Sequence, residues 1–290
     1  MTPLARPDSV KSALAFLALL LAAPHAVAAP FSTPVFSAAT LWHDNVTNAE
    51  RSTDILPAVQ TVATVAASHR HLLGRNDSLI FDAQLRAEAW PRYDGLDRTA
   101  LGTALTWQHK FALGAFAPTL RAELTADLLA ARERDRSGRA GTAALVYRQR
   151  FAEVMRGQLG HEWSRTDTRA LAFDRTARTS FAQLARQFGD AWELSLGARQ
   201  RDGTVQSYSS PPRPDLVAKG KKITFVPTFD RATPDIAYYF DARTVSFELR
   251  AVRTLGPRLA LTFSAETSRT THGNQSYLNR VFSAAIIRTF

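Results

Sequence analysis

Apolar and polar side chains alternate along much of this sequence, which restricts the chain to sheets with one apolar face. The clearest case is residues 79–90. One set of side chains there is wholly apolar: Leu79, Phe81, Ala83, Leu85, Ala87 and Ala89. The intervening set is mostly polar or charged: Ile80, Asp82, Gln84, Arg86, Glu88 and Trp90. Because successive side chains of a strand point to opposite faces, the pattern predicts a strand. Its run of polar positions favours the wall of a barrel with a wet interior over a soluble sheet.

The last fourteen residues, Tyr277 to Phe290, follow the same rule and end on an aromatic residue. Phe282, Ala284, Ile286 and Phe290 share one face, and the opposite face is small or polar apart from Ile287. This terminus resembles the closing strand of bacterial outer-membrane β-barrels. The resemblance implies that Phe290 is the assembly signal and that the barrel-assembly machinery is a partner. Arg288 departs from the apolar residue usual there, although a long basic side chain near the interface can reach water.

The N-terminus has the features of an export signal. Arg6 and Lys11 precede an apolar run over residues 13–23, and Ala26-Val27-Ala28 supplies the small residues of a cleavage site. These features predict a secretory signal peptide over residues 1–28. The apolar run is too short for a membrane-spanning helix. Residues 29–290 would then form a single barrel domain in the outer membrane of a Gram-negative bacterium.

The alternating segments number about twelve, although residues 176–188 alternate too poorly for their faces to be assigned. Short turns are expected near residues 72–77, 111–117, 151–153, 188–191 and 254–257. Longer polar loops are expected near 44–57, 91–98, 132–139, 165–175, 202–237 and 270–276. Short periplasmic turns and long extracellular loops are typical of an all-β, transmembrane, antiparallel up-and-down barrel with an even strand number. The longest loop, 202–237, becomes extended at residues 223–226, and it could fold over the mouth or add a hairpin beyond the membrane.

Composition agrees with export. There is no cysteine, which excludes a disulfide scaffold or a thiolate metal site. Mean hydropathy is only −0.17, as expected when every second wall residue is apolar. The net charge is +10 and the pI about 10.5. For an exported barrel we interpret this excess as attraction to anionic lipopolysaccharide and to anionic solutes, and we expect no nucleic-acid partner.

Charged side chains of the polar face are the candidate site. The pore-lining residues predicted from alternation are Asp82, Arg86, Glu88, Arg121, Glu123, Asp127, Arg148, Arg156, Glu162, Glu193, Arg199, Glu248, Arg250 and Glu266. Opposite charges on neighbouring strands can pair and hold the wall together. Arginines left unpaired would attract anions. Arg148, Arg150 and Arg156 should lie together at the periplasmic mouth, beside Glu153, because a short turn joins their strands.

Two further readings of the sequence concern hydrolysis and export. The outer-membrane phospholipases use a His and a Ser two residues apart, whereas His272 and Ser276 are four apart in an expected loop. No catalytic, cofactor-binding or metal-binding residue is therefore predicted.

The segment Asp44-Asn45-Val46-Thr47-Asn48-Ala49 resembles a segment of surface lipoprotein assembly modifiers and of exopolysaccharide-export barrels, although such runs also form ordinary turns.

The sequence thus predicts a narrow, weakly anion-preferring, porin-like pore for passive transport of small solutes, without enzymatic activity. The alternative is a structural or export-associated barrel with an occluded lumen. A third possibility is a membrane-embedded hydrolase. Outer-membrane lipid and lipopolysaccharide are the expected surroundings in every case.

Overall fold

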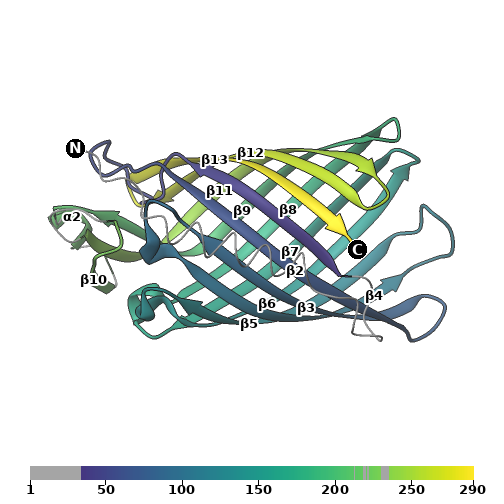
Figure 1. Ribbon diagram of the computed structural model, residues 1–290, viewed down its shortest axis with the longest axis horizontal. Coiled ribbons are helices and arrows are strands. Elements are labelled where there is room, and N and C mark those ends of the chain that lie inside the picture. The colour runs from purple at the N-terminus through teal and green to yellow at the C-terminus, as the bar shows by residue number, and fades with distance from the viewer. Residues whose placement is uncertain (1–33, 212, 218–219, 221, 230–234) are drawn as a thin grey trace.

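Twelve antiparallel strands close into a barrel in the computed structural model (Figure 1), which describes residues 34–211, 213–217, 220, 222–229 and 235–290. The wall strands are β1 (Val35–His43), β2 (Ala58–Leu72), β3 (Asp77–Ala89), β4 (Arg98–Lys110), β5 (Thr119–Ala131), β6 (Gly138–Ala152), β7 (Met155–Thr168), β8 (Arg175–Phe188), β9 (Trp192–Ser209), β11 (Asp235–Gly256), β12 (Leu259–His272) and β13 (Gln275–Thr289). Each strand pairs with the next, and β13 closes the barrel on β1. The predicted fold class and the count of about twelve strands are confirmed. The predicted signal peptide lies outside the described residues.

A thirteenth strand lies beyond the wall. Strand β10 (Lys222–Val226) pairs only with the first residues of β11, and the short helix α2 (Pro214–Val217) precedes it. Short 3₁₀ turns cover Asp94–Leu96, Arg134–Arg136 and Leu171–Phe173. Among the described residues, no helix is both long and apolar enough to cross a membrane. We call the end of the barrel near Thr289 the turn end, and the opposite end, where α2 and β10 lie, the cap end (Figure 1).

The outer surface of the wall is apolar, as alternation predicts. Leu101, Leu124, Leu128 and Leu196 are 57–65% exposed, which only a surrounding bilayer makes favourable. Strand β8 explains why residues 176–188 resist assignment. Its outward positions include Arg178, Ser180 and Arg186, whereas an aromatic residue points inward: the inward set is Ala177, Thr179, Phe181, Gln183 and Ala185.

Aromatic side chains mark both ends of this apolar band. Trp107, Trp192 and Phe290 are exposed towards the turn end, and Trp42 and Trp163 towards the cap end. At the turn end the guanidinium groups of two arginines lie over aromatic rings, Arg253 at 5.4 Å from the Trp192 centroid and Arg288 at 5.0 Å from that of Phe290. Arg288 is thus accommodated on the outer face by extension towards the boundary. Trp90 instead turns inward and packs against buried loop residues.

Several predicted loops are wrong in their extent. The segment 202–237 is not one loop, because β9 continues to Ser209 and β11 begins at Asp235. The expected loop 270–276 is a two-residue turn at 273–274, with Gly273 at φ +55°. Residues 165–168 belong to β7. The extended structure expected at 223–226 is present as β10.

Candidate functional site: the barrel interior and its cap

The predicted lining residues all lie on the strand face opposite the exposed apolar residues. Their ion pairs differ from those expected, because most join two positions of one strand. Three pairs of this kind are Arg86–Glu88 at 2.9 Å, Arg121–Glu123 at 3.7 Å and Arg250–Glu248 at 2.7 Å. Because residues two apart in a strand share a face, opposite charges at these positions can neutralise each other without a partner on another strand. Asp82 accepts a hydrogen bond from Ser68, and Asp127 lies against Gly102.

Glu88 is the most buried of these charges, with its side chain only 4% exposed. Its carboxylate pairs with Arg86 and Arg98, each at 2.9 Å, and accepts a hydrogen bond from Gln60 at 2.8 Å. Gln60 in turn contacts the His43 ring at 3.2 Å. This network fixes β1 to β4 at the cap end of the lumen. The buried carboxylate is thus fully paired, which gives the network a structural role.

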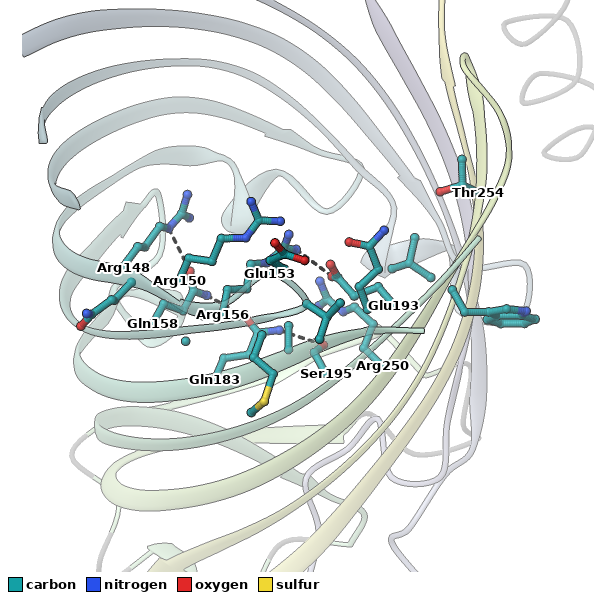
Figure 2. A pocket seen from close by; sticks show the side chains of 18 of the residues that line it. Arg148, Arg150, Glu153, Arg156, Gln158, Gln183, Glu193, Ser195, Arg250 and Thr254 are labelled. Atoms are coloured by element: carbon teal, nitrogen blue, oxygen red, sulfur yellow. Dashed lines mark hydrogen bonds and ion pairs between the residues drawn. The ribbon is translucent and has the colours of Figure 1, made fainter. Parts of the chain in front are cut away.

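Arginines converge on a chamber at the turn end (Figure 2). The chamber has a volume of about 1020 Å³ and is lined by four arginines: Arg148, Arg150, Arg156 and Arg250. Three carboxylates also line it: Glu153, Asp190 and Glu193. Arg156 pairs with Glu193 at 2.7 Å. Among the lining residues arginines therefore exceed carboxylates by one. Within the described chain, Arg150, Glu153 and Asp190 have no ion pair, and Arg250 pairs with Glu248, which does not line this chamber.

A row of hydrogen bonds crosses the wall of this chamber from β6 to β9 (Figure 2). Arg148 donates to Gln158 at 3.0 Å, Gln158 donates to Gln183 at 2.7 Å, and Gln183 donates to Ser195 at 3.0 Å. Four neighbouring strands are thereby linked through their inward polar side chains.

A second chamber of about 510 Å³ lies nearer the middle of the barrel and shares Gln158, Gln183 and Arg250 with the first. Three arginines and three glutamates line it: Arg199, Arg201, Arg250, Glu162, Glu248 and Glu266. Its charges therefore balance, unlike those of the turn-end chamber. Phe181 also lines it.

Strands β9 and β11 continue beyond the wall at the cap end. Strand β8 pairs with β9 only as far as Gly203, and β12 pairs with β11 only from Arg243. Residues 205–209 pair with residues 236–240, and all of residues 204–209 and 235–240 are buried. A two-stranded extension with both faces buried must lie between two layers. We call this extension, with α2, β10, Thr228 and Phe229, the cap.

The cap reaches across the mouth. In the cyclic strand order, β11 lies six strands from β4, diametrically opposite. Yet Phe229 of the cap packs edge-on against Tyr93, in the β3–β4 connection, with centroids 5.2 Å apart. Tyr208, Val226 and Ala237 join the same cluster, together with Phe173 from the β7–β8 connection. Apolar contacts thus join the cap to the opposite side of the mouth.

Arg136 makes the central polar contacts between the cap and the loops beneath it. Its guanidinium pairs with Glu133 at 2.8 Å, donates to the Tyr208 hydroxyl and to Thr228, each at 3.1 Å, and lies 4.3 Å from the centroid of Phe173. The side chains of Arg136 and Glu133 are 13% and 14% exposed. Burial by itself would lower the pKa of Arg136, but Tyr208 and Glu133 together raise it above its ordinary value. Arg136 therefore stays charged and joins the β5–β6 connection to the cap.

The segment Asp44–Ala49 also contacts the cap. Asn45 and Thr47 are buried and hold the loop by hydrogen bonds to Ala49 and Asp54, while Asn48 takes the left-handed conformation at φ 52°. The Thr47 carbonyl accepts from the Tyr208 amide at 2.9 Å, and Asn48 donates to the Gln206 carbonyl at 3.0 Å. The local sequence is thus explained by a tight loop that receives the cap.

Two His–Ser combinations bear on the hydrolase reading. His272 contacts the Asp241 carbonyl and the Phe240 ring, and the described chain has no hydrogen bond between it and Ser276. On the outer face, His161 Nδ1 and Ser180 Oγ lie 2.9 Å apart. In the described part of the chain no carboxylate holds the second nitrogen of His161, so this pair lacks the orienting member of a triad.

Sequence reasoning missed the cap residues and Phe181. A signal for the cap was present in residues 236–240, Ile-Ala-Tyr-Tyr-Phe, where an unbroken apolar run replaces alternation. Such runs are typical of strands covered on both faces. Arg136 and Phe173 lie in polar connections and carry no comparable signal.

No protein-family model and no curated protein matches this chain. Among solved structures, an outer membrane channel from Pseudomonas putida F1 is similar with a TM-score of 0.55 and 12% identity, over 92% of this chain and 99% of that one. The KdgM porin is similar with a TM-score of 0.44 and 7% identity, over 88% of this chain and 99% of that one. LpxR from Salmonella typhimurium is similar with a TM-score of 0.42 and 11% identity, over 88% of this chain and 100% of that one. At these identities the likeness shows the fold, and the resemblance to bacterial outer-membrane β-barrels is confirmed.

Proposed function

We propose that this protein is a narrow outer-membrane channel for passive diffusion of small solutes, with a weak preference for anions and no enzymatic activity. The observation that carries the proposal is the turn-end chamber, where arginines exceed carboxylates by one and Arg150 is unpaired. Arginine is charged at any physiological pH, so the excess persists. Salt screens it over about 8–10 Å, which limits the preference to low ionic strength.

In this proposal the turn end faces the periplasm and the cap end faces the cell exterior. The outward band of leucines contacts lipid and the cap end contacts lipopolysaccharide. Residues 1–28 direct export, and Phe290 is recognised by the assembly machinery. The remaining lumenal charges, among them Asp82, Glu123 and Asp127, support the wall rather than select solutes.

A barrel with an occluded lumen is the second candidate, and the cap favours it. Single-channel recording of the purified protein in planar bilayers separates the two. We expect brief, small openings whose reversal potential in a KCl gradient lies on the anion side. A cation-selective current would overturn the preference. No current from either the wild type or a variant with a weakened cap would overturn the channel and leave the occluded barrel.

A further inference from the structure

We infer that the central chamber at Phe181 is a binding subsite for a neutral, ring-shaped, hydroxylated solute of the monosaccharide type. The inference rests on the proposed channel for its physiological meaning, because it names the class of solute that would pass. It is argued from the one aromatic side chain, in the described chain, that lines this chamber.

The tip of the Phe181 ring lies over Gly160, its cross-strand partner on β7. A methyl group built at Gly160 would lie 2.5 Å from Cζ and 2.9 Å from Cε1 of the Phe181 ring. Glycine therefore makes room for the ring against the backbone. On β9, Gly197 adjoins Gln183 and has no side chain to cover the ring from that side. Phe181 is half-buried and lines the central chamber.

Polar groups of both kinds surround this ring. Arg199 is the cross-strand partner of Phe181 on β9. Glu162 on β7 is the cross-strand partner of Thr179, which lies two residues before Phe181 on β8. Glu266 reaches the same chamber from β12. Within the described chain none of these three has an ion pair or a side-chain hydrogen bond. Their donors and acceptors therefore face the chamber.

This combination fits one class of solute. A sugar hydroxyl both donates and accepts, so it can satisfy a carboxylate and a guanidinium together. The polarised C–H bonds on one face of a sugar ring suit the negative face of an aromatic ring. A net charge on the solute would gain nothing from a lining of three arginines and three glutamates. The volume of about 510 Å³ lies within the range of small-molecule sites.

Binding of D-glucose to the whole protein in detergent micelles tests the inference without requiring transport. Saturation-transfer NMR should show contacts to the C–H bonds of the ring, and titration should show saturable binding. Sorbitol, which has similar hydroxyl groups on an open chain, should bind at least about tenfold more weakly, because a flexible chain must be ordered on binding.

Phe181→Leu keeps an apolar side chain but removes the flat ring, and it should weaken glucose binding at least about tenfold. Phe188→Leu makes the same change on the same strand at an outward position that is 45% exposed, and it should have no effect. Gly160→Ala, whose Cβ would meet both the Phe181 ring and the Leu145 carbonyl oxygen, should also weaken glucose binding. Equal binding of glucose and sorbitol, no glucose binding, or equal behaviour of the two leucine variants would overturn the subsite.

The outcomes separate this inference from the channel. Glucose binding without any bilayer current would overturn the channel and leave the subsite. An anion-selective current with no glucose binding would overturn the subsite and leave the channel.

Discussion

Replacing Arg136 with alanine should open the cap. The change removes an ion pair at 2.8 Å and two hydrogen bonds at 3.1 Å, and it leaves Glu133 charged with its side chain 14% exposed. Loss of one partner from a buried pair costs about 3–5 kcal/mol, and we take about 3 because water reaches this pair. At about 1.4 kcal/mol per factor of ten, the ratio of open to closed cap should rise about 100-fold.

Two measurements report this ratio. The open probability of single channels should rise with Arg136→Ala, and protease added to the folded protein should cut the cap near Lys222 faster. Arg139→Ala is the matched control, because Arg139 is three residues away and its pair with Asp167 is at 3.5 Å with Arg139 77% exposed. Exposed pairs contribute about 0–1 kcal/mol, so this variant should change the ratio less than about fivefold.

A double variant tests the cause. Arg136→Met with Glu133→Gln removes both charges and fills the same space, so it should restore closure beyond the level of Arg136→Ala. If Arg136→Ala and Arg139→Ala behave alike in both assays, Arg136 does not hold the cap. If cleavage accelerates while current stays unchanged, the cap does not control the passage of ions.

Three further predictions concern the wall, the chamber and the terminus. Leu85→Arg on the outer face should destabilise the folded protein by about 2–4 kcal/mol in a denaturant titration from lipid, and Gln84→Arg on the inner face should be nearly neutral; equal costs would contradict the assignment of faces. Changing three arginines of the turn-end chamber to glutamine should move the reversal potential towards cations in a salt gradient, and an unmoved potential would place selection elsewhere; the residues are Arg148, Arg150 and Arg156. Deleting Phe290 should lower the amount of folded protein in the outer membrane and leave protein in the periplasm; undiminished insertion would contradict its role as the assembly signal.

The fold was predictable because its environment imposes a simple period. Each wall strand has bilayer on one side and a wet lumen on the other. Strand β3 therefore carries Leu85 and Gln84 on opposite faces, and this alternation identifies it as a wall strand from sequence. The arginines near the turn end could be grouped for a similar reason, since a short turn between β6 and β7 brings Arg148 and Arg156 together. Local sequence determines both features.

The cap was not predictable from the same reasoning. Residues 204–209 and 235–240 are covered on both faces, so no alternation distinguishes them, and their polar neighbours made them look like loop. The inward position of Phe181 was not predicted for a related reason, because alternation assigns that lumenal position to a polar residue. In both cases contacts between segments far apart in sequence decide the outcome, such as Tyr93 with Phe229.

The two proposals place control of opening and recognition of solute at different levels of the barrel. The cap is held by Arg136 and its partners, none of which lines either chamber, and Phe181 lines a chamber that the Arg136 network does not touch. Sites that share no partners usually contribute additively. Combining Arg136→Ala with Phe181→Leu should therefore raise the open probability as much as the first change alone and weaken glucose binding as much as the second alone. A departure from additivity in either measurement would mean that solute in the central chamber influences the cap, which would make the two a single coupled device rather than a gate above an independent subsite.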